Sequence, residues 1–198
     1  CGSEVGWAIF TGFRVITLLQ PLEICGRYDA LIASLDGIGA AMRFANASEV
    51  GKGLFWALRS AAQIDSDTHV IFFSDGHEAP PLAAGQTGLP AVDTEMRRPG
   101  LVVGVGGDTA VPIPRVDRTG RSLGVWKRDE VVQRSGAGSA GSSEELSRLD
   151  QPHLRELAVQ SGLGYVRLTD AGLAGPLAEH GVARHVPVPT DLRWLPAV

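Results

Sequence analysis

The sequence predicts an α/β fold of three layers, in which helices cover both faces of a mostly parallel sheet. Two continuous apolar runs, residues 69–74 (HVIFFS) and 100–107 (GLVVGVGG), have the pattern of strands buried on both faces. Segments with helical periodicity alternate with strands, and the connections are short and rich in glycine. The length of 198 residues and the hydrophobic content of 44% suit a single domain spanning residues 1–198.

The first third of the chain predicts a hairpin followed by two helices. Val5–Thr11 and Arg14–Leu19 are short apolar runs on either side of Gly12, which indicates two antiparallel strands and a tight turn. Apolar residues recur at helical spacing over Tyr28–Met42, which predicts the first helix. A run of capping side chains then predicts a second helix that begins near Ser48.

The chain after residue 107 predicts an insertion and then a return to alternating elements. Prolines and glycines around short β-prone pieces indicate an irregular hairpin over Pro112–Val132, with a turn at residues 117–120. A Gly- and Ser-rich stretch predicts a flexible loop over Ser135–Ser143, so insertion and loop occupy residues 112–143. The remaining elements are a helix over Pro152–Ser161, a strand over Tyr165–Leu168, a helix over Ala171–Glu179 and an irregular tail over residues 181–198.

Charge and cysteine content exclude some classes of protein. The net charge of −4 argues against a nucleic-acid partner, because phosphate binding needs clustered lysines and arginines. No apolar stretch approaches the roughly 18 residues that cross a bilayer. Cys1 and Cys25 lack the spacing of a metal or redox motif. The residues alone leave open whether these two cysteines pair or are unpaired core residues.

Two residues are candidate metal ligands. Asp75 follows the strand at residues 69–74, so its carboxylate should lie at the edge where parallel sheets bind ligands, beside the permissive Gly76. Ser48, at the start of a helix, could add a hydroxyl oxygen. Mg²⁺ and Ca²⁺ both prefer such oxygen ligands. The alternative is that Ser48 is a helix cap and Asp75 forms a turn.

The order of VGWAIFT, RVITLLQPLE, NASEVGKGL, HVIFFSDGHEAPPL and LVVGVGG resembles a von Willebrand factor A domain from its second strand onward. The resemblance implies a metal-ion-dependent adhesion site, with Ser48 at the position of the family's threonine and Asp75 at that of its aspartate. The family's Asp-x-Ser-x-Ser motif and its central first strand have no counterpart in this sequence. We therefore expect an upstream segment in the full protein, since two open strand edges would otherwise face each other.

A narrower resemblance links VGVGGDTAVPIPRVDRTGRSLGVW and LDQPHLRELAVQSGLGYVRLTDAGL to the bacterial BatA/BatB-like branch. PLEIC, SDGHEAPPL and VPIPRVDRTGRSLG are most similar to the MxaL-type accessory proteins of methanol dehydrogenase. The resemblance implies a periplasmic domain, membrane-anchored through segments outside this chain. It also implies a disulfide between Cys1 and Cys25. The implied role is non-catalytic help in inserting calcium into methanol dehydrogenase. The implied partners are that enzyme or other accessory proteins of the same domain type.

Two other functions remain open at this point. A hydrolase would need Cys25, Ser48 or Ser74 as nucleophile with His77 and Asp75, but no nucleophile signature of a known hydrolase type is present. A BatA/BatB-like interaction domain without metal binding is the second alternative. The sequence does not decide between this domain and a metal-dependent one.

Overall fold

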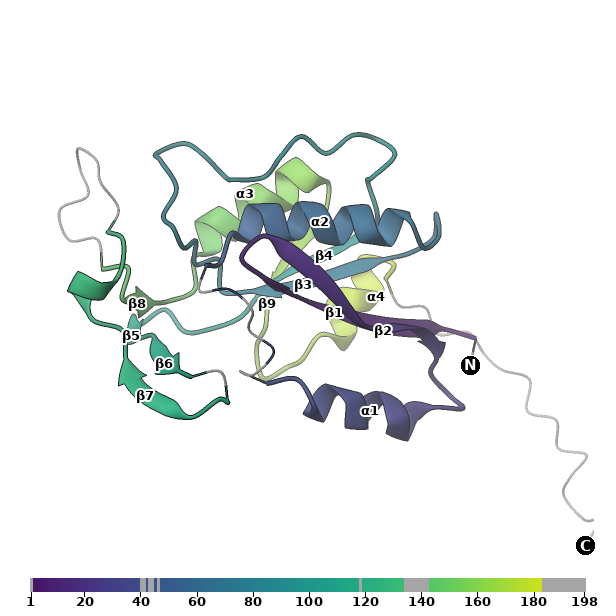
Figure 1. Ribbon diagram of the computed structural model, residues 1–198. Helices are drawn as coiled ribbons and strands as arrows, with labels where there is room; N and C mark the ends of the chain where they lie inside the picture. Colours follow the sequence, from purple (N-terminus) through teal and green to yellow (C-terminus); the bar gives the residue numbers. More distant parts are fainter. Residues whose placement is uncertain are drawn as a thin grey trace, which may run out of the picture.

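The computed structural model describes residues 2–39, 42, 45, 47–117, 119–133 and 143–182. Its first four elements match the order expected from the sequence (Figure 1). Strands β1 and β2 pair antiparallel around the turn at Gly12, and two helices follow them. The bounds are β1 Glu4–Thr11, β2 Arg14–Glu23, α1 Tyr28–Asp36 and α2 Val50–Ala62.

A three-stranded parallel sheet lies at the centre of the described residues, in the order β3–β4–β9. Its strands are β3 Val70–Ser74, β4 Gly100–Gly104 and β9 Gly164–Arg167. The central strand β4 is buried along its whole length, as its continuous apolar sequence predicts. The predicted α/β class with a parallel sheet is thus confirmed.

Helices α2 and α3 (Gln151–Ser161) cover one face of this sheet, and α1 and α4 (Ala174–Glu179) lie on the other side (Figure 1). The core sits under α2 and α3, where apolar side chains from both helices meet the inward side chains of β3 and β4. Its central members are Val50, Leu54, Leu58, Val70, Phe72, Val102, Leu154 and Leu157.

The opposite face of β3 departs from the prediction that this strand is covered on both sides. Ile71 and Phe73 alternate with the core residues of β3 and remain 37% and 50% exposed. Their neighbours on β4, Leu101 and Val103, are fully buried. The covering layer on this side therefore extends over β4 but ends before β3.

The β1–β2 hairpin forms a sheet of its own, and none of the described strands joins it to β3 by a ladder. Helix α2 contacts both the hairpin and β3. The rings of Phe10 and Phe72 stack between the two sheets, with centroids 5.1 Å apart. Side-chain packing thus joins the two sheets where the sequence predicts a gap of one strand.

Residues 47–49 form a second link between the two sheets. The backbone N–H of Gly12 donates to the Ala47 carbonyl at 2.8 Å, and Glu49 N–H donates back to the Gly12 carbonyl at 2.9 Å. Ser48 and Ala79 exchange two backbone hydrogen bonds, of 2.7 and 2.8 Å. This segment ties the turn of the hairpin to the loop that follows β3.

An arm projects from the carboxyl end of β4 (Figure 1). Its described part contains β5 (Val111–Pro112), paired with β8 (Leu146–Ser147), and the hairpin of β6 (Pro114–Val116) and β7 (Ser122–Val125), followed by the 3-10 helix η2 (Arg128–Glu130). The Asp117 carboxylate accepts hydrogen bonds from Thr119 and Arg121 and so closes the expected hairpin turn. The flexible loop expected over Ser135–Ser143 lies outside the described residues except for Ser143, and so does the tail from residue 183.

Several helix boundaries differ from those predicted, among them the start of α4, which is Ala174 rather than Ala171. Helix α1 ends at Asp36 rather than at Met42. The chain turns at Gly37, and glycine, which also occupies position 39, has a low helix propensity. Helix α2 begins at Val50, and Ser48 is not its cap because the Ser48 backbone is bridged to Ala79. The helix predicted over Pro152–Ser161 begins one residue earlier, at Gln151 after the N-cap Asp150, and ends at Ser161 as predicted.

Cys25 is disulfide-bonded, whereas Cys1, the partner implied by the resemblance, lies outside the described residues. Among the described residues, none of the helices has the length and apolar character needed to cross a bilayer.

Candidate functional site

An open cleft of about 660 Å³ lies at the carboxyl ends of β3 and β4, beside the base of the arm. This is the edge where parallel sheets of α/β proteins bind their ligands. Apolar, hydroxyl and charged side chains all reach it. Its lining comprises Phe73, Ser74, Asp75, Val105, Gly106, Gly107, Asp108, Thr109, Val111, Ser147, Arg148 and Leu149.

Asp75 is held in this cleft by three hydrogen bonds. The Ser147 hydroxyl donates to Asp75 Oδ2 at 2.6 Å, and the backbone N–H of His77 donates to Oδ1 at 3.0 Å. The Asp75 carbonyl accepts the N–H of Asp150 at 2.8 Å, at the start of α3. Contacts to the arm, the loop and a helix therefore fix the position of the carboxylate.

Of the two carboxylates that line the cleft, Asp108 forms an ion pair with a described residue and Asp75 does not. Arg167 in β9 donates to both carboxylate oxygens of Asp108, at 3.0 Å each. Arg148 lines the cleft with an exposed side chain. Among the described residues, no ion pair includes Asp75. In the described part of the chain, hydrogen bonds rather than an ion pair therefore hold the Asp75 carboxylate.

Ser48 lies in a different hollow, of about 290 Å³, lined by β1, the end of the α1 segment and residues 47 and 48. The sequence predicts a partial metal site that includes both Ser48 and Asp75; in the structure, Ser48 lines this hollow and Asp75 lines the cleft. Ca²⁺ takes six to eight oxygen ligands, and no cluster of three acidic, histidine or cysteine side chains occurs in the described part of the chain. These residues alone do not fit a complete metal site, and the joint site stays a prediction.

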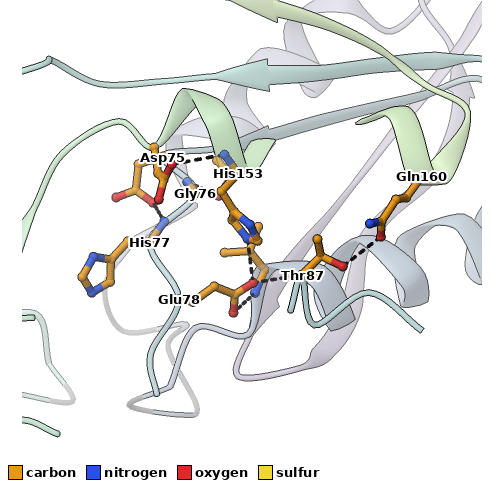
Figure 2. A network of polar contacts seen from close by, with 11 residues as sticks. Asp75, Gly76, His77, Glu78, Thr87, His153 and Gln160 are labelled. Carbon is orange, nitrogen blue, oxygen red and sulfur yellow. Dashed lines mark hydrogen bonds and ion pairs between the residues drawn. The ribbon is translucent and has the colours of Figure 1, made fainter. Parts of the chain in front are cut away.

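Glu78 links the loop after β3 to two helices (Figure 2). Its buried carboxylate accepts the N–H groups of Val50 and Gly51 at 2.9 Å each, so it caps the first turn of α2. Nε2 of His153, on α3, lies 3.1 Å from Glu78 Oε1. The loop that carries Asp75 is therefore held rigidly between α2 and α3.

The arrangement does not favour the hydrolase alternative. His77 offers Asp75 its backbone N–H, and its ring turns away from the Asp75 carboxylate (Figure 2). The Ser74 hydroxyl accepts the Gly76 N–H at 3.0 Å. In the described cleft, the hydroxyl nearest Asp75 belongs to Ser147 and has no imidazole beside it to act as a base.

Sequence reasoning missed two residues of this cleft. Asp108 directly follows the predicted strand at residues 100–107, although β4 itself ends at Gly104, so the rule that identified Asp75 also finds Asp108. Ser147 reaches Asp75 through the pairing of β8 with β5, which depends on contacts between segments far apart in the sequence. No local pattern would have identified it.

Comparison with known proteins gives a likeness in fold. No protein-family model matches it, and no curated protein matches it. It resembles the crystal structure of an aerotolerance-related membrane protein from Bacteroides fragilis, solved with multiple mutations to serines. The two share 18% sequence identity at a TM-score of 0.56, over 91% of this chain and 80% of the other. At this identity the likeness concerns the fold.

Proposed function

We propose that the chain is a non-catalytic protein-interaction and assembly module of the von Willebrand factor A type, with the cleft around Asp75 as its partner-binding surface. The carrying observation is that Asp75 is rigidly held in an open cleft at the ligand edge of the sheet, without an ion pair among the described residues. A carboxylate held in place by hydrogen bonds suits recognition, because its position requires little ordering when a partner binds.

The chemistry of the cleft supports a binding role over a catalytic one. Activation of a hydroxyl requires a positioned base, and in the described residues Ser147 donates directly to a carboxylate instead. An aerotolerance-related membrane protein has a similar fold.

The finer form of this proposal is an accessory factor for the maturation of periplasmic methanol dehydrogenase, in which calcium is the cargo. Support for it comes from the resemblance of the segments SDGHEAPPL and VPIPRVDRTGRSLG. The second form is a BatA/BatB-like, membrane-associated interaction domain without bound metal. The structural likeness and the incomplete ligand set around Asp75 favour this second form.

A binding experiment separates the two forms. We would titrate the chain into calcium-free methanol dehydrogenase by calorimetry, with Ca²⁺, with Mg²⁺ and with a chelator. The variant Asp75→Ala tests the cleft, and Asp36→Ala removes an exposed carboxylate from the end of α1 as a matched control.

Binding that Asp75→Ala weakens and Asp36→Ala preserves would support the cleft as the binding surface. The same result with dependence on Ca²⁺ would support the maturation role. Absence of binding under all three conditions would refute that role. Equal binding by Asp75→Ala would remove the cleft from the proposal.

A further inference from the structure

The cleft around Asp75 combines an apolar wall with a carboxylate. Phe73 and Val111 line it and remain 50% and 56% exposed, and Val105 and Leu149 add further apolar surface. Such a wall suits the aliphatic stem of a long side chain, which packs on apolar surface while its charged head reaches a polar partner.

The Asp75 carboxylate has acceptor capacity left over. Two carboxylate oxygens offer about four acceptor positions. Ser147 and His77 fill two of them, one on each oxygen. The remaining positions, and the lack of an ion pair to Asp75 among the described residues, favour a ligand that brings its own N–H donors.

A cationic side chain fits these features better than a bare metal ion does. Asp108, the other carboxylate of the cleft, already receives two hydrogen bonds from Arg167, so it is less free to bind a metal. A divalent ion would need more oxygen ligands, whereas a lysine ammonium carries three donors and an arginine guanidinium five.

We infer that the cleft receives a lysine or arginine side chain of a protein partner, its stem against Phe73 and Val111 and its head on Asp75. The inference rests on the proposed function and names the chemistry of the partner at that surface. Arg148, exposed at the rim, repels the incoming charge and so limits its affinity. A volume of about 660 Å³ leaves room for the backbone that flanks the side chain.

The test uses small probes and the whole isotope-labelled chain, observed by amide NMR first with a chelator and then, in a second series, with Ca²⁺. The probes are Nα-acetyl-lysine methylamide and its arginine, norleucine and glutamate counterparts. The lysine probe should shift the amides of Gly106, Gly107 and Thr109 in a saturable way. The norleucine and glutamate probes should shift them little.

Two variants check the source of the effect. Asp75→Asn keeps the size of the side chain and should weaken lysine binding about tenfold, because a hydrogen bond between charged groups is lost. Arg148→Ala removes the like charge of an exposed residue and should tighten lysine binding roughly twofold. The amide spectrum of each variant also reports whether it is folded.

Equal shifts with lysine and norleucine would overturn the inference, because the pocket would then be merely apolar. Unchanged affinity in both variants, or lysine binding only after addition of Ca²⁺, would also overturn it. If neither the lysine nor the arginine probe binds while Asp75→Ala still weakens partner binding, the proposed function stands and the cationic side chain is refuted. If a cationic probe binds but no protein partner does, the cleft binds a cationic side chain and the proposed function is refuted.

Discussion

Replacing Glu78 by alanine tests the account of how the loop after β3 is held. The substitution removes the acceptor for two buried backbone N–H groups, those of Val50 and Gly51. Each buried donor left unsatisfied costs about 1–3 kcal/mol, or roughly 2–6 kcal/mol for the pair. Water that enters the vacated space can accept hydrogen bonds from these N–H groups in part, so we expect the free energy of unfolding to fall by about 2–4 kcal/mol.

Urea unfolding followed by circular dichroism measures this loss. Glu78→Gln keeps one acceptor oxygen and should lose roughly half as much stability. The control is Glu156→Ala, which removes an exposed carboxylate of α3 and should change the free energy by less than about 0.5 kcal/mol. A loss below about 0.5 kcal/mol for Glu78→Ala would refute the role of Glu78 as the cap of α2.

Three further predictions concern the core, helix packing and the arm. Leu154→Ala deletes a fully buried side chain and should lower the free energy of unfolding by about 2–5 kcal/mol in urea titrations. Gly51→Ala would force a methyl group against the backbone at residues 87–89 and should lower the melting temperature. As a control, Gly175→Ala adds a methyl group that contacts nothing and should preserve or raise the melting temperature. The Thr119 hydroxyl, followed by backbone N–H donors, holds the pKa of Asp117 below its ordinary value. The ionised Asp117 should therefore stabilise the hairpin turn fully at a pH above its ordinary pKa, and this stabilisation should be lost as the pH falls through the lower pKa of the folded state. Thr119→Val should raise the pKa of Asp117 in an NMR titration.

The order and type of the main elements could be predicted because each has a local pattern. The apolar run at residues 100–107 contains the buried strand β4, and Asp150 and Gly162 mark the ends of α3 with a side-chain cap and a left-handed glycine. The exposure of Phe73 could not be predicted in this way. It depends on how far the layer of helices on the far face extends, which is a property of the tertiary arrangement.

The candidate site was predictable only in part. Asp75 follows from the position of its strand in a parallel sheet, and the structure places it at the expected edge. Ser48 was predicted to cap a helix, yet the carboxylate that performs this task is that of Glu78, nearly thirty residues away. Sequence patterns identify caps supplied by the preceding residues, and a cap supplied by a distant loop leaves no such pattern.

The separate hydrogen-bonding of the β1–β2 hairpin has a consequence for how the protein opens. Within the described residues, the hairpin and the parallel sheet are joined by helix α2, by the contact of Phe10 with Phe72 and by the backbone bridges of residues 47–49. No continuous ladder transmits the opening of one sheet to the other. Amide protons of the hairpin should therefore exchange with solvent through a local opening, of lower free energy than the global unfolding that exposes β4. For the chain described here, we therefore expect two cooperative units of unequal stability, with Asp75 in the more stable one.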